Sequence, residues 1–178
     1  MLYMCPHCKA EFSVTAKSDA TLCCTQCGYE QTSDIYGFLH NEKQFGPELR
    51  YVSDWSKLVF EQLQDKIRQG EDTVLSAQTA VYMIDSQKDK FTQAGRGTVT
   101  LSEEGFVLDG VLHGEQVSLQ IPIAGIPTLP FSPGKHFEIQ DGKTIYRCVL
   151  DDGKLVMKFI NMIKIFYRLS DTKVKVAR

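Results

Sequence analysis

The stretch that decides the fold of the N-terminal part reads CPHCKAEFSVTAKSDATLCCTQCG, residues 5–28. It holds two cysteine pairs, Cys5/Cys8 and Cys24/Cys27, each with two residues between its members. This spacing places both thiols of a pair on one tight turn, where they point toward a common centre. Four thiolates complete the tetrahedral shell of a structural zinc site and leave no open coordination position. The pattern therefore predicts that these four cysteines bind one structural zinc ion.

The chain around the cysteines is expected to form two hairpins. Fifteen residues separate the two pairs, which is enough for the chain to turn and come back to the metal. Segments 11–15 and 28–32 alternate as strands do. Residues 1–37 are therefore predicted to be a zinc ribbon. A module of this size buries little apolar surface, so zinc is expected to supply most of its folding free energy.

Two nearby residues are alternative metal ligands. Cys23 leaves a three-residue gap to Cys27, which fits a tight turn less well, and is predicted to be a small buried or edge residue. His7 lies inside the first pair and is expected to face solvent. Cys-x-x-Cys also occurs in redox proteins, but two pairs at this spacing favour metal. Clustered cysteines, with Cys148 alone far downstream, indicate a reducing compartment.

Composition places the chain among ordinary globular proteins. Its 178 residues are 43% hydrophobic and 24% charged, with a formal net charge of −2, so no global basic field attracts nucleic acid or membranes. The N-terminus has no signal-peptide pattern. The longest uncharged run, residues 116–134, contains four prolines, which would break a membrane-spanning helix. We therefore expect a cytoplasmic protein without a transmembrane segment.

Residues 38–70 are predicted to be a linker followed by an amphipathic helix. Ser53 or Asp54 can cap the helix start, and Gly70 is a natural stop. The apolar residues recur mostly at three- and four-residue steps, as one helix face requires: Trp55, Leu58, Val59, Leu63 and Ile67. Trp55 is interpreted as a core anchor rather than a ligand-stacking residue.

Residues 71–178 change to a hydrophobic period of two, which is typical of strands. Seven strands are expected, at 73–84, 97–101, 105–110, 116–121, 126–129, 136–140 and 144–150. Residues 155–169 return to a helical period. Seven strands and one terminal helix predict a seven-stranded PH-like (GRAM-like) barrel capped by that helix. The fold class is thus mainly β with α.

A family resemblance rests on the segment GTVTLSEEGFVLDG, residues 97–110. This segment resembles the opening hairpin of GRAM and other PH-like domains. A four-cysteine ribbon, a Trp-bearing helix and a GRAM-like barrel, in that order, resemble the C-terminal extension of some bacterial lysophospholipid (1-acylglycerol-3-phosphate) acyltransferases. The resemblance covers nearly the whole chain but includes no acyltransferase domain. It implies an accessory region of such an enzyme, either part of a longer chain or encoded alone.

The sequence offers no convincing catalytic residue. The acyltransferase signature is a His and an Asp with four residues between them, followed by a phosphate-binding block. Only His136 and Asp141 have that spacing, and they lie on a predicted strand without the block. Cys148 alternates with apolar neighbours and is predicted to be a buried thiol rather than a nucleophile. The chain itself is therefore not expected to be catalytic.

The expected function is a non-catalytic docking module associated with phospholipid acyltransferase. The partner would be an acyltransferase domain or an anionic membrane surface bound peripherally. Membrane binding would use the loop around Lys88 and Lys90, with Arg96 beyond it, and the late basic residues Lys154, Lys158, Lys164, Arg168, Lys173, Lys175 and Arg178. A solvated helix face with a frayed tail is the preferred explanation of the late residues. The alternative is a small zinc-ribbon protein that binds nucleic acid or another protein. Nucleic acid ranks second because Lys9 and Lys17 are outnumbered by neighbouring acidic residues.

Overall fold

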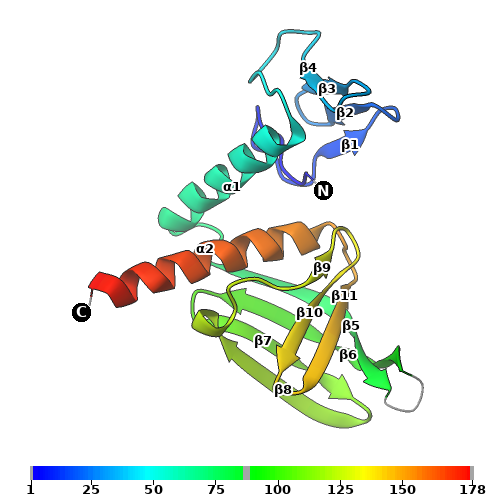
Figure 1. Cartoon of the computed structure of the whole chain (residues 1–178), viewed down its shortest axis with the longest axis vertical. Helices are drawn as coiled ribbons and strands as arrows, with labels where there is room; N and C mark the ends of the chain where they lie inside the picture. The colour runs from blue at the N-terminus through cyan, green and yellow to red at the C-terminus, as the bar shows by residue number, and fades with distance from the viewer. Residues whose placement is uncertain (1, 86–88, 177–178) are drawn as a thin grey trace. The chain divides into compact units, whose positions relative to one another are not determined.

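The computed structural model describes residues 2–85 and 89–176, with side chains as far as Asp171. The chain forms two compact units, Met1–Gln69 and Gly70–Arg178 (Figure 1). It is mainly β with two α-helices. The sequence predicts three parts, 1–37, 38–70 and 71–178. In the structure the linker and the first helix belong to the same unit as the cysteines, and the second unit begins at Gly70.

The first unit contains a small antiparallel sheet in the order β1-β2-β3-β4. Its strands are β1 (Val14–Ala16), β2 (Thr21–Cys24), β3 (Glu30–Ser33) and β4 (Leu39–His40). β1 and β3 begin two or three residues later than the alternation predicts. Positive φ angles at Phe12 (55°) and Gly28 (76°) explain the delay, because left-handed residues cannot continue a strand.

Helix α1 (Val52–Arg68) starts before the predicted capping residues. Asp54 lies inside the first turn, and its carboxylate accepts the backbone N–H groups of Arg50 (3.1 Å) and Tyr51 (2.8 Å). Asp54 therefore fixes the helix start from within, and Ser53 is not the N-cap. The buried stripe is Trp55, Val59, Leu63 and Ile67.

Trp55 anchors α1 to the cysteine segment, as the sequence predicts. The side chain is fully buried, and its indole Nε1–H donates to the carbonyl of Met4 at 3.0 Å. Its ring meets Tyr29 edge-on at 6.0 Å between centroids. This single residue thus joins the helix both to Met4, which directly precedes Cys5, and to Tyr29, which follows Cys27 by two residues.

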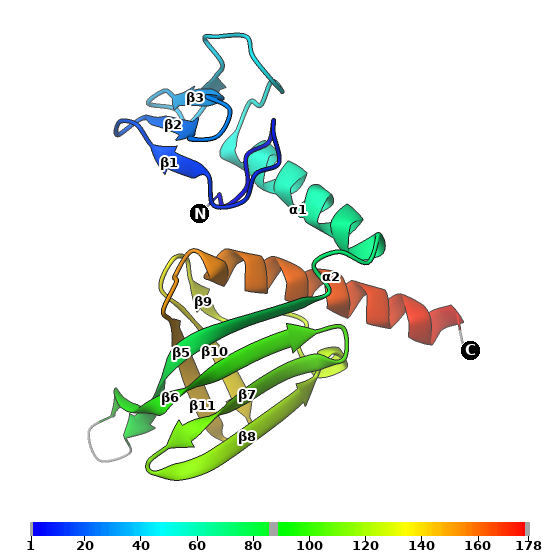
Figure 2. The ribbon, with the colours of Figure 1, turned by 180° about the vertical axis from the view of Figure 1, so that it is seen from behind.

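The second unit is a seven-stranded antiparallel sheet, in the order β8-β7-β6-β5-β11-β10-β9, followed by helix α2 (Leu155–Val176). The strands are β5 (Val74–Asp85), β6 (Lys90–Ser102), β7 (Gly105–Leu112), β8 (Glu115–Pro122), β9 (Phe131–Ser132), β10 (His136–Asp141) and β11 (Thr144–Leu150). The sheet curls so that β10 and β11 lie over β6 and β7 (Figures 1 and 2). The structure confirms the total of seven strands followed by one helix, and six of the seven predicted strands overlap an observed one. Among the described residues, no helix combines the length and apolar character needed to cross a membrane.

Three phenylalanine rings form the centre of this unit. Phe106 from β7 meets Phe137 from β10 edge-on at 5.8 Å, and Phe137 meets Phe159 from α2 at 5.4 Å. All three side chains are fully buried. These contacts pack strands β7 and β10, from opposite parts of the curled sheet, against helix α2.

The predicted strand at 126–129 is wrong. The chain instead forms a short 3-10 turn, η1 (Ile123–Gly125), and the fifth strand of this sheet in chain order is β9 at Phe131–Ser132. Pro127 and Pro130 have no N–H to donate to a ladder, which disfavours a strand there. The apolar pattern that predicted this strand comes from Ile126 and Leu129. Both side chains are buried, but neither residue belongs to a strand.

Close packing of two strands explains why segment 97–110 has glycine at positions 97 and 110. Gly97 and Gly110 pair directly across β6 and β7. A Cβ atom added to Gly97 would lie 3.0 Å from the Cα of Gly110 and would also meet the carbonyl of Asp109. The two strands therefore approach each other more closely than side chains would allow.

Candidate functional site

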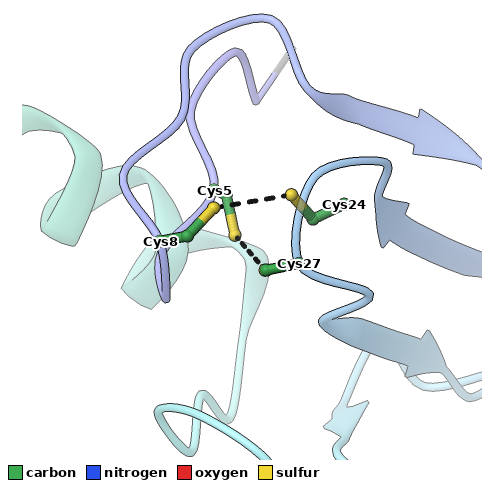
Figure 3. A group of neighbouring side chains, drawn as sticks. All are labelled: Cys5, Cys8, Cys24 and Cys27. Carbon is green, nitrogen blue, oxygen red and sulfur yellow. Dashed lines mark hydrogen bonds between the residues drawn. The ribbon is translucent and has the colours of Figure 1, made fainter.

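The structure brings the four predicted cysteine ligands together (Figure 3). The Sγ atoms of Cys5 and Cys27 are 3.7 Å apart, as are those of Cys8 and Cys24, and all four lie within 4.8 Å of one another. Thiolates around one zinc ion at about 2.3 Å would lie roughly 3.8 Å apart. All four cysteines are free of disulfides. The cluster could hold a metal ion, and its dimensions fit tetrahedral zinc.

Two similar turns place these thiols. In the first, the N–H of Lys9 donates to the carbonyl of Cys5 at 3.0 Å; in the second, the N–H of Gly28 donates to the carbonyl of Cys24 at 3.0 Å. Both turns end in a left-handed residue, Lys9 with φ 62° and Gly28 with φ 76°. Glycine adopts this conformation without strain, whereas lysine does so at a cost.

The surroundings of the thiols shift their pKa values in opposite directions. Burial opposes ionisation of Cys24, but the Ser13 hydroxyl at 3.3 Å and the backbone N–H groups of Cys27 and Gln26 outweigh it and lower the pKa of Cys24 to about 6. Burial raises the pKa of Cys5 and that of Cys27. Cys24 is thus the thiol best prepared to bind a cation first. Four cysteine ligands would leave a bound zinc no position for substrate, so the site is suited to a structural role.

The remaining candidates at this end of the chain lie outside the cluster. Cys23 sits on β2 between Thr15 and Glu30 and does not belong to the group of close thiols. The side chain of His7 is exposed, as predicted, with its ring 4.3 Å from that of Phe45.

Cys148 is fully buried, and burial raises its pKa to about 12. A thiol in this state is neither ionised nor accessible at neutral pH, so it does not act as a nucleophile. The prediction of a buried thiol is confirmed.

The structure separates His136 from Asp141. They lie at opposite ends of β10, and five steps along a strand span roughly 17 Å and change the face on which the side chain lies. Burial lowers the pKa of His136, whose nearest acidic partner is Glu138 at 4.0 Å. The pair therefore does not form a catalytic dyad. Within the described part of the chain, the four thiols are the only cluster of three or more potential metal ligands.

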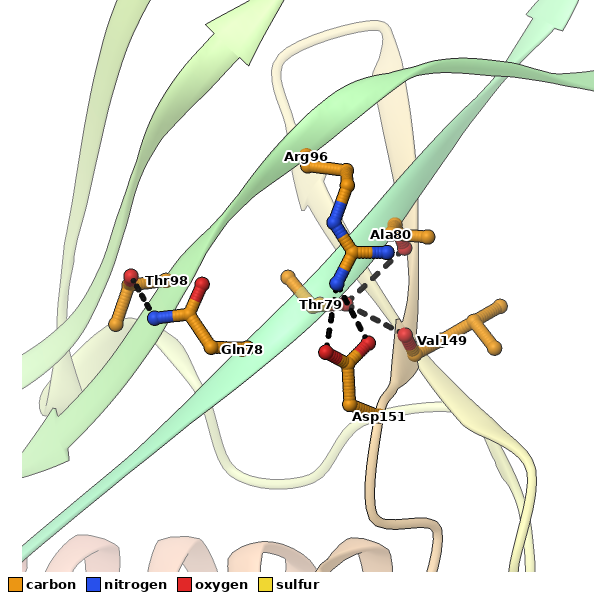
Figure 4. A network of polar contacts seen from close by, with 7 residues as sticks. All are labelled: Gln78, Thr79, Ala80, Arg96, Thr98, Val149 and Asp151. Carbon is orange, nitrogen blue, oxygen red and sulfur yellow. Dashed lines mark hydrogen bonds and ion pairs between the residues drawn. The ribbon is translucent and has the colours of Figure 1, made fainter.

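Several basic residues considered for membrane contact are already paired. Lys158 is buried, and its Nζ donates to Asp72 at 2.9 Å. Arg96 donates two hydrogen bonds to the carboxylate of Asp151, at 2.8 and 2.6 Å (Figure 4). Lys88 and Arg178 lie outside the described residues, as do the side chains of Lys173 and Lys175.

A turn between β3 and β4 exposes two apolar side chains that no sequence pattern marks as a site. Ile35 is 91% exposed and Tyr36 is 78% exposed. One carboxylate oxygen of Asp34 accepts the N–H groups of both Tyr36 and Phe38 at 2.9 Å. The other oxygen lies 3.0 Å from His40 Nε2, and this contact lowers the pKa of Asp34.

Backbone hydrogen bonds close the same turn. The N–H of Gly37 donates to the carbonyl of Asp34 at 3.1 Å, and the N–H of Asp34 donates to the carbonyl of Phe38 at 3.0 Å. The local signal is Asp34-Ile35-Tyr36-Gly37, in which Asp and Gly are typical turn residues. Two large apolar side chains are therefore held in solvent on a fixed backbone.

Comparison with known proteins assigns no family. No protein-family model matches the chain, and no curated protein matches it in sequence. Among solved structures, similar chains include the Ran-binding domain of the nuclear complex component Nup2 from Ashbya gossypii, 10% identical with a TM-score of 0.41 over 55% of this chain and 97% of that one. The EVH1 domain of Dm DCP1, solved with an XRN1 DBM peptide, is 11% identical with a TM-score of 0.41 over 69% of this chain and 98% of that one. Both TM-scores lie below 0.5, so neither likeness bears on what this chain does.

Proposed function

We propose that this chain is a non-catalytic docking module that binds a protein partner, with a zinc ribbon as its first unit and a PH-like (GRAM-like) module as its second. Zinc in the four-thiol cluster stabilises the first unit. The partner is the acyltransferase domain of a phospholipid-synthesising enzyme, as the sequence resemblance implies. The order of seven strands and a terminal helix supports the PH-like assignment.

The observation that carries the proposal is the Asp34-held turn. Apolar side chains on a monomeric surface usually have no consequence when they are scattered singly. Ile35 and Tyr36 are adjacent, and the hydrogen bonds to Asp34 fix their backbone before any partner arrives. A backbone that is already fixed loses less entropy on binding, and tyrosine is enriched among interface hot spots.

The ion pairs of the first unit favour a protein partner over nucleic acid. Lys17 and Lys43 both pair with Glu30, at 2.7 and 2.9 Å. Lys66 pairs with Glu11 at 3.1 Å. A phosphate backbone needs a surplus of cations, and the two glutamates leave these three lysines a surplus of only one positive charge. In the second unit, the buried pairing of Lys158 likewise weakens the case for an anionic membrane.

Direct binding tests this proposal. Purified chain is titrated with a purified lysophosphatidic acid acyltransferase domain from the same cells, and the heat of binding is recorded. We expect a complex that the paired change Ile35→Ser with Tyr36→Ser abolishes. Lys57→Ser, on the exposed face of α1, is the matched control and should bind as the unchanged chain does. Binding that persists in the paired variant would show that the Asp34-held turn is not the docking site.

The non-catalytic part of the proposal has its own test. The isolated chain should transfer no acyl group to lysophosphatidic acid, since His136 and Asp141 are far apart. Acyl transfer that disappears in His136→Ala would overturn this part of the account.

A further inference from the structure

The second unit contains an apolar pocket of about 240 Å³. It lies where the end of β8 and the segment after it approach the hairpin of β10 and β11. Its apolar lining consists of Ile121, Ile126, Leu129, Pro130, Ile139 and Ile145. Pockets for whole small molecules usually have volumes of roughly 300–1,000 Å³. This pocket is therefore smaller than the usual site for a complete ligand and large enough for one apolar side chain.

Local hydrogen bonds hold one wall of the pocket in place. The N–H of Glu138 donates to the carbonyl of Pro130 at 2.8 Å, and the N–H of Ile126 donates to the carbonyl of Ile123 at 3.0 Å. Pro127 and Pro130 restrict the backbone of the same segment further. The pocket is thus preformed and does not require a ligand to order it.

An unpaired strand edge runs beside the pocket. β9 pairs only with His136 and Phe137, so among the described residues no strand continues along that side of β10. The N–H of Glu138 points to this side, toward Pro130. Because backbone direction in a strand alternates with a period of two, the N–H of Gln140 points to the same side. Gln140 itself lines the pocket.

The charge of the pocket lining favours a peptide over a fatty acid or a phosphate. Glu138 is the only charged residue that lines the pocket. One of its carboxylate oxygens accepts two hydrogen bonds from Arg147, at 2.9 and 2.7 Å, while the Arg147 guanidinium lies 3.6 Å from the centre of the Phe91 ring. No cation lines the pocket to receive a fatty-acid carboxylate or a phosphate. An acyl chain would also leave the backbone donor of Gln140 unpaired, whereas a peptide would satisfy it.

We propose that this pocket binds an extended, uncharged or basic peptide segment of a partner protein. The peptide backbone pairs with β10 at Gln140, and one aliphatic side chain enters the pocket between Ile121 and Ile139. The apolar lining gives a carboxylate no partner that would offset the cost of removing its charge from water, which excludes acidic residues from that position. The site is separate from the Asp34-held turn and does not depend on it.

Amide chemical shifts of the full chain, loaded with zinc, test the proposal. The probes are acetylated and amidated heptapeptides of alternating threonine and lysine, with valine, isoleucine or leucine at the centre. A peptide with aspartate at the centre and decanoate are the controls. We expect at least one aliphatic peptide to shift the amide signals of Ile121, Ile139 and Gln140, and neither control to do so. No shift with any of the three peptides, or a shift with decanoate alone, would overturn the proposal.

A matched pair of variants tests the backbone contact. Gln140→Pro removes the outward N–H at an edge position, where proline is compatible with a strand. Gln140→Ala removes the side chain but keeps the N–H. The proline variant should bind the best peptide roughly tenfold more weakly than the alanine variant, which has also lost the side chain but keeps the N–H. Equal binding by both variants would contradict strand pairing, and Ile35→Ser with Tyr36→Ser should leave peptide binding intact.

Discussion

Cys5 Sγ and Cys27 Sγ lie 3.7 Å apart, although the two residues are 22 positions apart in the chain. A disulfide would require about 2.05 Å, so this spacing belongs to thiols that share a centre. Cys8 and Cys24 repeat it across the same cluster. The account expects about one zinc per purified chain, with sulfur neighbours near 2.3 Å in X-ray absorption.

The neighbouring cysteines Cys23 and Cys24 provide a matched test of the ligand set. Cys24→Ser should release the metal and unfold the first unit, because zinc supplies most of the folding free energy of so small a module. Cys23→Ser should retain it, since Cys23 is outside the cluster. Elemental analysis and circular dichroism of both variants measure this difference. Full zinc retention in Cys24→Ser would contradict the assignment.

Zinc affinity should fall as the pH falls, because protons compete with the metal for thiolates. Burial keeps Cys5 and Cys27 protonated at pH 8 in the metal-free chain, so metal binding displaces their protons. Cys24, with its pKa lowered to about 6 despite burial, is already ionised there and competes with protons only below that pH. A plot of log affinity against pH, measured with a chelator, should therefore steepen by about one proton below pH 6. A constant slope across pH 6 would contradict the thiolate character of Cys24.

The two cysteine turns predict opposite responses to substitution. Gly28 has φ 76° and open space around its Cα, so Gly28→Ala costs conformational strain alone, about 1–2 kcal/mol. A competing chelator should then remove zinc from this variant at a roughly 5- to 30-fold lower concentration than it needs for the unchanged chain. Lys9→Gly, at φ 62° in the other turn, removes strain and should retain zinc at least as well as the unchanged chain. Equal loss from both variants would show that backbone conformation does not govern the site.

Sequence patterns predicted the features that depend on local spacing. The two cysteine pairs, the helical stripe that includes Trp55, and most strands of the second unit follow from residue periods of two to four. The strand at 126–129 failed because its apolar residues pack in the core while two prolines prevent ladder bonds. Periodicity records burial, and burial alone does not distinguish a strand from a buried turn.

Pairing between distant residues could not be predicted in the same way. Lys158 looked like one of several exposed late cations, yet it is buried against Asp72, 86 positions earlier. The exposure of Ile35 and Tyr36 could not be predicted either, because an apolar pair between two strand segments normally indicates residues of the hydrophobic core. Only the three-dimensional arrangement shows which apolar residues remain in solvent.

The Lys158–Asp72 pair predicts a large cost for removing one partner. Asp72 has φ 51°, which asparagine tolerates, so Asp72→Asn removes the charge without adding backbone strain. The change removes the negative charge that faces the buried Lys158 ammonium group and should cost about 3 kcal/mol of unfolding free energy. Arg96→Gln breaks an ion pair that is 56% and 52% exposed and should cost under about 1 kcal/mol. Urea denaturation of both variants gives the comparison, and similar costs would contradict the structural role of the buried pair.

Photo-cross-linking from position 36 tests the central claim, docking of a protein partner on the Asp34-held turn, most directly. A benzoylphenylalanine replaces Tyr36 in cells that make the protein, and a control chain carries it at Lys57, which is 77% exposed on α1. After irradiation, the account predicts a discrete adduct from position 36 alone, whose cross-linked peptide maps to an acyltransferase domain. No protein adduct from position 36, or the same adducts from both positions, would contradict it.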